Sequence, residues 1–188
     1  MIQLVFACAP TRNVEGKIEM AFGLDDGLPW KHISQDFKNF KARTEGTTLI
    51  MGARTFQSLP AKLVGRRHIV THSGRRDVPL TKSGHEADQY ILPERVGFYV
   101  KHHPEENLSI IGGVQLLQQF APIADKIIMT KIVKSHYVNS TAKLPVEFVN
   151  NIARGGLSET VNDLVMKENH FWQIDELTQL FETVYAKP

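Results

Sequence analysis

The chain has 188 residues and a mass of 21.2 kDa, which is the size of a single domain. Apolar residues make up 42% of it and charged residues 22%, so its composition excludes a disordered chain, a collagen-like fibre and a coiled coil. The formal net charge of +2 is too small to indicate a nucleic-acid or membrane partner, and no apolar run approaches the ~20 residues that span a bilayer. We expect one domain over residues 1–188.

The first residues are apolar and contain Cys8, the single cysteine of the chain. This run lacks the basic segment that opens a signal peptide, and it stops at Pro10, so we interpret it as a buried strand. One cysteine permits no internal disulfide, which fits a reducing, cytoplasmic compartment. Its apolar surroundings favour a small core residue over a nucleophile.

Strand-like and helical runs alternate along the first 75 residues. A strand is predicted over residues 2–9, followed by a long irregular segment over 10–29, and loops of this length are usually functional. The 3–4 spacing of apolar residues predicts a helix over 34–44, with Ser34 as its N-cap. A strand at 47–51, a short helix at 53–59, a strand at 68–71 and a turn at 73–77 follow.

The alternation continues in the second half. We expect a helix at 93–103, a strand at 108–111, a helix at 114–120 and a strand at 126–133. Residues 158–185 look like two strands, with Phe171, Trp172, Ile174 and Leu180 as core candidates. Strands that alternate with helices predict an α/β fold, with a largely parallel sheet and an antiparallel C-terminal edge.

Three features indicate a ligand site. Gly112 and Gly113 stand between a strand and a helix, where a phosphate can approach the backbone, although a tight turn without a ligand explains the same pair. Asp36 stands among aromatic residues on the predicted helix. If buried, its carboxylate could hold a flat ligand with two adjacent N–H donors, whereas an isolated helical Asp is more often a solvated surface residue. Arg54 and Arg66, beside strands, suit anionic groups at two ends of a cleft or are solvated edge charges.

Other chemistries have less support. The GxGxxG fingerprint is missing, so an ordinary Rossmann dehydrogenase is not expected. The eight histidines are scattered and no HExxH sequence occurs, so we expect no metal site. A serine hydrolase would need a GxSxG elbow, which the chain lacks.

Together, five segments in order resemble dihydrofolate reductases, from residue 1 to about residue 141. They are residues 28–30, Asp36 with Phe40, residues 50–56, residues 65–66 and residues 111–113, with Thr130 and Thr141 as further matches. The long loop after Ala9 and residues 138–141 look like those of the reductases of large tailed phages.

The resemblance implies a mostly parallel eight-stranded sheet with an antiparallel C-terminal edge, flanked by helices. It also implies reduction of 7,8-dihydrofolate to tetrahydrofolate with NADPH, by hydride transfer to C6 and protonation at N5, in support of one-carbon metabolism and thymidylate synthesis. The implied partners are dihydrofolate and antifolate-like small molecules, with no nucleic acid and no membrane. The chain would be a monomer or homodimer in the cytoplasm, the host's for a viral protein.

The family's motifs imply catalytic roles for Asp36, Thr130, Leu28 and Trp30. Asp36 would bind the pterin 2-amino group and N3 and raise the basicity of N5, and Thr130 would fix this carboxylate through a hydrogen bond. Arg66 would clamp the glutamate α-carboxylate of the substrate. The remaining residues of the implied substrate pocket are apolar: Val5, Ala7, Phe37, Phe40, Leu59, Leu63 and Ile111.

The implied NADPH site has three parts. A mobile loop over residues 23–28 would close on the nicotinamide and exclude water, residues 113–117 would hold the pyrophosphate and ribose, and residues 54, 55 and 73 would hold the adenosine end. The full implied set is Ala7, Phe22, Gly23, Asp26, Gly27, Leu28, Gly52, Ala53, Arg54, Thr55, His72, Ser73, Gly112, Gly113, Val114, Gln115, Leu116, Leu117 and Thr141.

Three residues depart from the family's common pattern. Ala53 stands where many members have a basic residue for the 2′-phosphate, although Arg54 follows it. Leu117 replaces a frequent aromatic residue near the nicotinamide, and Ser140 replaces a frequent acidic residue before Thr141. These departures bear on cofactor affinity and turnover and leave the fold prediction unchanged.

Two alternatives remain beside this interpretation. A pyrimidine reductase of riboflavin synthesis shares the fold and uses NADPH, but it is not expected to combine Asp36 with Arg66. A structural component that binds folate without turnover would also keep the fold. The retained Asp36, Thr130 and paired glycines argue against a decayed site.

Overall fold

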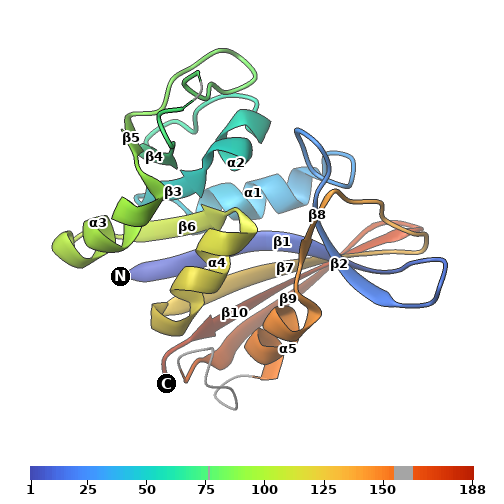
Figure 1. Cartoon of the computed structure of the whole chain (residues 1–188). Helices are drawn as coiled ribbons and strands as arrows, with labels where there is room; N and C mark the ends of the chain where they lie inside the picture. The colour runs from blue at the N-terminus through green and yellow to red at the C-terminus, as the bar shows by residue number, and fades with distance from the viewer. Residues whose placement is uncertain (76, 155–162) are drawn as a thin grey trace.

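A computed structural model describes residues 1–75, 77–154 and 163–188, and Figure 1 shows a twisted central sheet with helices on both faces. Eight strands follow one another in the order β5-β4-β3-β6-β1-β7-β10-β9. In chain order they are β1 (Ile2–Arg12), β3 (Thr48–Gly52), β4 (His68–Thr71), β5 (Gln89–Ile91), β6 (Leu108–Gly112), β7 (Lys126–Lys134), β9 (Val165–Asp175) and β10 (Thr178–Ala186). All pairs from β5 to β7 are parallel, and β10 is antiparallel to both neighbours. The predicted parallel sheet with an antiparallel C-terminal edge is confirmed.

Two further strands extend this sheet at one end. β2 (Ile18–Gly23) pairs antiparallel with β1, and β8 (Ala142–Leu144) pairs with β2. The prediction of an irregular segment over 10–29 was therefore wrong at residues 10–12 and 18–23, which are strand. The Asn13 side chain accepts the backbone N–H groups of Glu15 and Lys17, both at 3.0 Å, and Gly16 adopts a φ of 77°. These local bonds close a hairpin that hydrophobic periodicity does not reveal.

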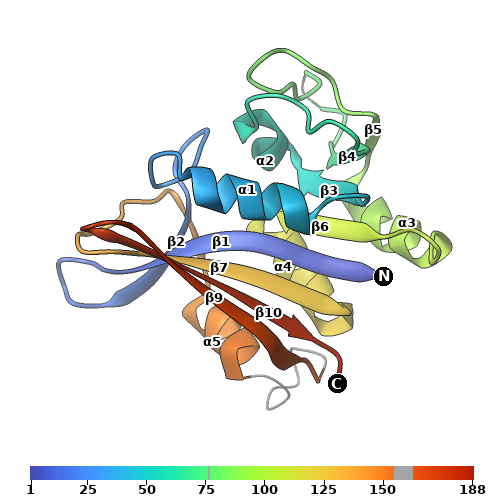
Figure 2. The same cartoon turned by 180° about the vertical axis from the view of Figure 1, so that it is seen from behind.

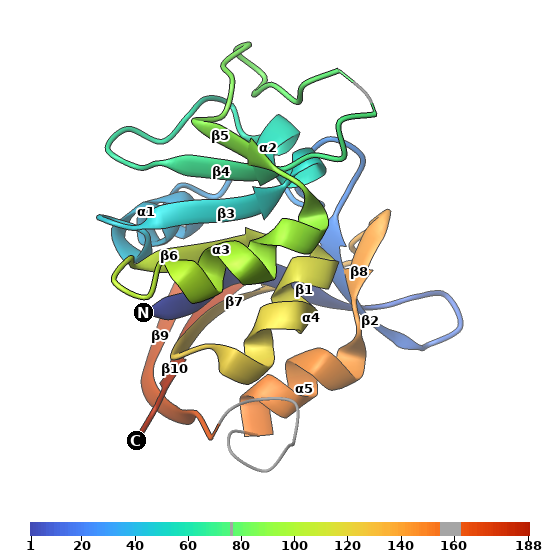
Figure 3. The same ribbon diagram turned by 60° about the vertical axis from the view of Figure 1, so that its left-hand side comes forward.

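The helices are α1 (Ser34–Arg43), α2 (Ala53–Ser58), α3 (Val96–His102), α4 (Val114–Phe120) and α5 (Val146–Arg154), with short 3₁₀ turns at Pro93–Arg95 and Ala121–Ile123. Figure 2 shows α1 across one face of the sheet, and Figures 1 and 3 show α3, α4 and α5 on the other. The prediction that Ser34 is the N-cap of α1 was wrong. Ile33 takes that position in an extended conformation, without a side-chain cap. β5, β8 and α5 were not predicted, and both of these strands have only three residues.

The two faces of the sheet are packed differently. On the α3–α5 face, each helix contributes three buried side chains to a core that includes Leu4, Leu117 and Phe120. On the other face, α1 has no buried residue. Its Phe37 and Phe40 lie half-buried against a second cluster around Val5 and Ile111. The surface below α1 is therefore the less completely covered one.

The last two strands are packed from one side. Leu180 is fully buried as predicted, and Trp172 and Ile174 are partly buried beside it. Phe171 was wrongly assigned to the core: it lies on the edge strand β9, is 52% exposed and contacts the Phe181 ring. Residues 158–162 of the predicted pair lie outside the described residues. In the described part of the chain, no helix is both long and apolar enough to cross a membrane.

Candidate active site

Asp36 lies in the first turn of α1, on the incompletely covered face of the sheet. Burial raises the pKa of its carboxyl to about 6, and the nearby negative charge of Glu182 adds to the rise. Within the described residues the Asp36 side chain has no hydrogen-bond donor. This carboxyl is therefore free to accept two N–H groups from a ligand, and it is close to its titration range at neutral pH.

Three residues of adjacent strands form a row below α1. Ala7 of β1 is in register with Thr130 of β7, and Thr130 is in register with Glu182 of β10. Thr130 is buried, yet the described residues show no hydrogen bond between its hydroxyl and Asp36. The implied Thr130–Asp36 bond is not among the hydrogen bonds of the described residues, and it stays a prediction. Both remain available to a ligand.

The apolar residues of the implied substrate pocket gather as expected. Val5, Leu63 and Ile111 are buried in one cluster, with Phe37, Phe40 and Leu59 half-buried against it. Trp30 and Ala7 belong to a neighbouring cluster, where the indole N–H of the buried Trp30 has no partner among the described residues. Leu28 is 52% exposed at the end of its loop. These side chains provide a partly open apolar wall beside Asp36.

Arg66 is fixed at the C-terminal end of α1. Its Nε donates to the carbonyl and the hydroxyl of Thr44, at 3.1 and 3.0 Å, and its Nη1 donates to the Val64 carbonyl at 2.8 Å. Its Nη2 donates to the carbonyl of Lys41. The guanidinium therefore satisfies carbonyls that a helix end leaves unpaired. The clamp on a substrate carboxylate stays a prediction, and the remaining N–H groups of Arg66 are the ones that could serve it.

The paired glycines lie where β3 and β6 end. Gly112 has a φ of 135°, and a Cβ there would lie 3.1 Å from Thr55 Oγ1 and 3.2 Å from the Phe22 ring. A Cβ on Gly52 would lie 3.5 Å from the Gly113 nitrogen. The backbone therefore closes tightly between β2, β3, α2 and β6, and it admits only glycine at residue 112. Several implied cofactor residues meet here.

The rest of the implied cofactor set is of two kinds. Leu116 and Leu117 are buried in the core below α4, so the structure does not support a side-chain contact from Leu117 to a cofactor. The Leu117 backbone N–H donates to the Gly113 carbonyl at 3.1 Å. Val114 and Gln115 lie in the first turn of α4. In contrast, Arg54 and Ser73 are exposed, and no partner of Arg54 is found in the described residues. His72 packs edge-on against Tyr90 near the end of β4.

The predicted loop over residues 23–28 is attached to the segment before β8. Thr141 donates its backbone N–H to the Gly23 carbonyl at 2.9 Å, and its hydroxyl accepts the Asp25 N–H at 2.8 Å. Leu24 and Gly27 exchange two backbone hydrogen bonds, which form a tight turn around Asp26. Thr141 therefore holds the loop, a contact through which it could affect a bound cofactor indirectly.

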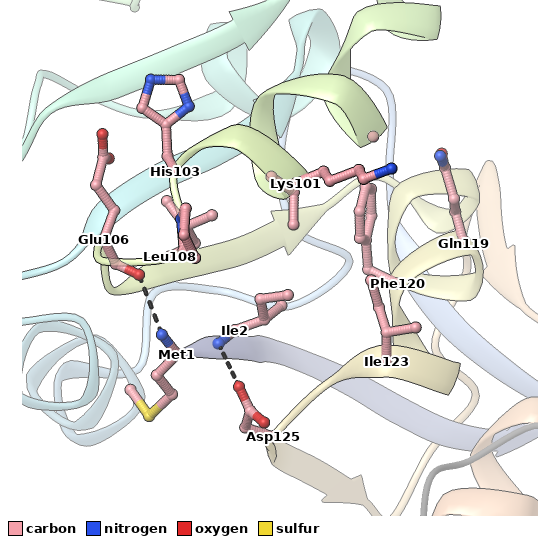
Figure 4. A pocket seen from close by; sticks show the side chains of 13 residues that line it. Met1, Ile2, Lys101, His103, Glu106, Leu108, Gln119, Phe120, Ile123 and Asp125 are labelled. Carbon is pink, nitrogen blue, oxygen red and sulfur yellow. Dashed lines mark hydrogen bonds between the residues drawn. The ribbon is translucent and has the colours of Figure 1, made fainter.

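Figure 4 shows a pocket at the opposite end of the strands, lined by Met1, Ile2, Lys101, Phe120 and Ile123 among others. It contains none of the implied site residues, so the candidate site does not rest on it. In residues 1–75, 77–154 and 163–188, no three His, Cys, Asp or Glu side chains gather as metal ligands would.

Sequence reasoning missed two charged residues of this region, Arg43 and Glu182. Glu182 is 3% exposed and pairs with Arg43, whose Nη2 lies 2.7 Å from Glu182 Oε1. The signal was present in β10, where Leu180, Glu182 and Val184 occupy successive positions on one face. A carboxylate between two buried apolar residues indicates an inward-facing charge.

Comparison with known proteins identifies the family of this chain. The family described as dihydrofolate reductase matches residues 2–150. This chain belongs to that family. It is 30% identical over 163 residues to the dihydrofolate reductase type 8 of Escherichia coli, covering 85% of this chain and 90% of the relative. It is 33% identical over 132 residues to the dihydrofolate reductase of Bacillus subtilis, covering 70% and 69% of the two chains.

A solved structure has the same fold. The dihydrofolate reductase from Enterococcus faecalis, complexed with NADP(H) and RAB-propyl, superposes with a TM-score of 0.69 at 20% identity, over 100% of this chain and 97% of that one. At this identity the likeness establishes the reductase fold.

Proposed function

We propose that this chain is an NADPH-dependent dihydrofolate reductase that converts 7,8-dihydrofolate to 5,6,7,8-tetrahydrofolate. The observation that carries the proposal is the half-buried carboxyl of Asp36, which has no partner in the described residues and stands beside a partly open apolar wall. A pterin is flat and has two adjacent N–H donors on one edge, and the carboxyl and the wall match these two features. The family match and the names of the relatives support the same function.

Asp36 supplies the negative charge in this mechanism. Above its pKa of about 6 the carboxylate is ionised, accepts the pterin 2-amino and N3 protons, and fixes the ring in place. Its negative charge favours a proton at N5 of the bound ring, which makes C6 a better hydride acceptor. Phe37, Phe40 and Ile111 exclude water from the ring faces and so strengthen this interaction.

The residues at the ends of β3 and β6 fit an NADPH molecule. Gly112 is enclosed by Thr55 and Phe22, whereas a Cβ on Gly113 would meet nothing within 4 Å, so the backbone is open to a phosphate at Gly113. Within the described residues Arg54 has no partner, and it is close in sequence to Gly52, which lies beside Gly113. NADPH supplies the hydride, and these residues bind and orient it.

The decisive experiment follows absorbance at 340 nm with dihydrofolate and NADPH. We expect turnover that depends on both compounds. Turnover of a riboflavin-pathway pyrimidine instead would support the pyrimidine reductase. Dihydrofolate binding by calorimetry without turnover would identify a non-catalytic folate-binding component.

Three finer assignments belong to the same proposal. The long segment after Ala9 and residues 138–141 support a place among the reductases of large tailed phages. The lone, buried Cys8, whose pKa burial raises to about 12, suits a reducing cytoplasm. A monomer or homodimer is expected, which sedimentation would distinguish.

A further inference from the structure

A charge pair lies between α1 and the β9–β10 edge of the sheet. Arg43 of α1 donates from Nε and Nη2 to the same Glu182 oxygen of β10, at 3.0 and 2.7 Å. The second carboxylate on this guanidinium is Glu168 of β9, at 2.6 Å. The side chain of Glu182 is 3% exposed and that of Glu168 is 43% exposed. The pair therefore has one buried partner and one solvated partner.

The buried partner lies in the row of strand residues below α1. Glu182 is in register with Thr130, which is in register with Ala7. Arg43 and Asp36 are seven residues apart on α1, which is two turns, so they lie on the same side of that helix. The pair thus lies on the same side of α1 as the carboxyl that would bind the pterin, two turns along the helix, without being one of the pterin's ligands.

We propose that Glu182, held by Arg43, is a positioning residue whose buried carboxylate acts through Asp36 on the protonation of the bound pterin. This inference rests on the proposed reductase function. It assigns to these two residues a part in the reaction that the family's motifs do not give them.

The direction of the effect follows from the charges around Glu182. Its charged neighbours are Asp36 and Arg43 on α1 and Glu168 and His170 on β9, while β7 presents the uncharged Thr130. The negative charge of Glu182 raises the pKa of Asp36, after the larger effect of burial, and it would favour a proton at N5 in the same way. The positive charge of Arg43 acts in the opposite direction.

Two substitutions should therefore shift the pH dependence in opposite directions. In Glu182→Gln the amide can still accept from Arg43, which also keeps Glu168, so the fold is preserved. The midpoint of kcat against pH should move down by roughly half a unit or more. In Arg43→Gln the midpoint should move up by a similar amount. In both variants KM for dihydrofolate should change less than about twofold, because neither side chain touches the substrate.

Glu168→Gln is the matched control, since it removes a carboxylate from the same guanidinium on the solvent side. Its midpoint should remain within about 0.2 units of the wild type, because solvent screens this charge. The titration of the Asp36 carboxyl in the free protein, followed by carbon-13 NMR, should show the same two opposite shifts without any turnover.

The outcomes separate the two proposals. If no variant and no wild-type protein turns over dihydrofolate, the reductase function fails, whereas the NMR titration still tests the link between Glu182 and Asp36. If Glu182→Gln leaves both the kinetic midpoint and the Asp36 titration unchanged, the inference is overturned. If one of the two variants does not fold, the direction in which the pH midpoint shifts in the other variant decides whether the inference holds.

Discussion

The two faces of the sheet differ in how completely their helices cover them. On one face α3, α4 and α5 each bury three side chains, whereas α1 on the opposite face buries none, although it is as long as any of them. Figures 1 and 2 show the two arrangements from opposite sides. The α3–α5 face is packed like an ordinary protein core, which stabilises the fold.

The α1 face instead holds groups that oppose folding. A carboxyl with a raised pKa, an indole N–H without a partner and half-exposed aromatic rings all lie there, in Asp36, Trp30, Phe37 and Phe40. Each is unfavourable in the free protein and becomes favourable when a ligand supplies the missing contact. Binding sites commonly sacrifice stability in this way, which is why we place the ligand on this face.

The largest effect should come from removing the charge at the centre of the α1 face. Asp36→Asn keeps the shape of the side chain but loses the negative charge that holds the pterin and favours N5 protonation. We expect a loss of about 10²–10⁴ in the rate at pH 7. Steady-state assays at 340 nm measure this, with Glu45→Gln, an exposed carboxyl just after α1, as control. Near-wild-type turnover in Asp36→Asn would contradict the assignment.

A second pair of substitutions tests the packing difference itself. Leu117 is fully buried on the α3–α5 face, so Leu117→Ala should cost about 2–5 kcal/mol in the free energy of unfolding. Phe40 is larger but half-buried on the α1 face, so Phe40→Ala should cost about 1–2 kcal/mol and mainly raise KM for dihydrofolate. Urea denaturation compares the two. An equal or larger loss in Phe40→Ala would show that the α1 face is packed as tightly as the other.

Most of the fold could be predicted from the sequence because its strands and helices are regular. Both β4 and α4 begin and end where the apolar pattern predicts. The hairpin to β2 was missed because it depends on side-chain bonds of Asn13, and β5 and β8 because three residues carry no periodicity.

The residues of the candidate site could likewise be predicted only in part. Asp36 and the glycines at 112 and 113 are recognisable because few residue types can perform their roles. Arg43 and Glu182 are 139 residues apart in the sequence, and only the packing of α1 against β10 brings them together. The fixed position of Arg66 depends on the carbonyls at the end of α1, which any sequence could supply.

The raised pKa of Asp36 predicts a pH dependence of stability. Its folded pKa of about 6 lies above the ordinary value of 3.8, so ionisation favours the unfolded chain. Stability from this group is lost as the pH rises from about 4 to 6, and above that the loss is constant at about 2–3 kcal/mol. Asp36→Asn should therefore match the wild type near pH 4 and exceed it by that amount at pH 7. Urea denaturation at both pH values tests this, and a constant difference would contradict it.

Arg66, fixed at the end of α1, is the residue that we propose for the substrate tail. Arg66→Leu should raise KM for dihydrofolate by about tenfold or more and change kcat less than about threefold, because the contact is remote from C6. Its carbonyl partners at the end of α1 would also lose a donor, which should cost about 1–2 kcal/mol of stability. Arg67→Leu is the matched control, since that neighbour donates to Gln89 and Tyr99 instead. A collapsed kcat with unchanged KM would give Arg66 another role.

The smallest effect should come from Arg54, at the edge of the α1 face. NADPH differs from NADH by a 2′-phosphate, and its recognition needs a cation, which Ala53 does not provide. Arg54 is the second residue of α2, is exposed and has no partner in the described residues, so its guanidinium can turn toward a phosphate without breaking another contact. Because the site is open to solvent, one charge-assisted contact should contribute about tenfold in affinity, the lower end of its usual range.

Arg54→Ala should therefore lower kcat/KM for NADPH by about tenfold through KM, while kcat/KM for NADH stays the same. Arg75→Ala serves as the comparison, since Arg75 is an exposed cation on the turn after β4 and the next nearest candidate in the implied adenosine region. An unchanged NADPH/NADH ratio in Arg54→Ala together with a reduced ratio in Arg75→Ala would move the phosphate site to that turn. The cofactor would then reach past α2 to the turn after β4, rather than ending at α2 as we propose.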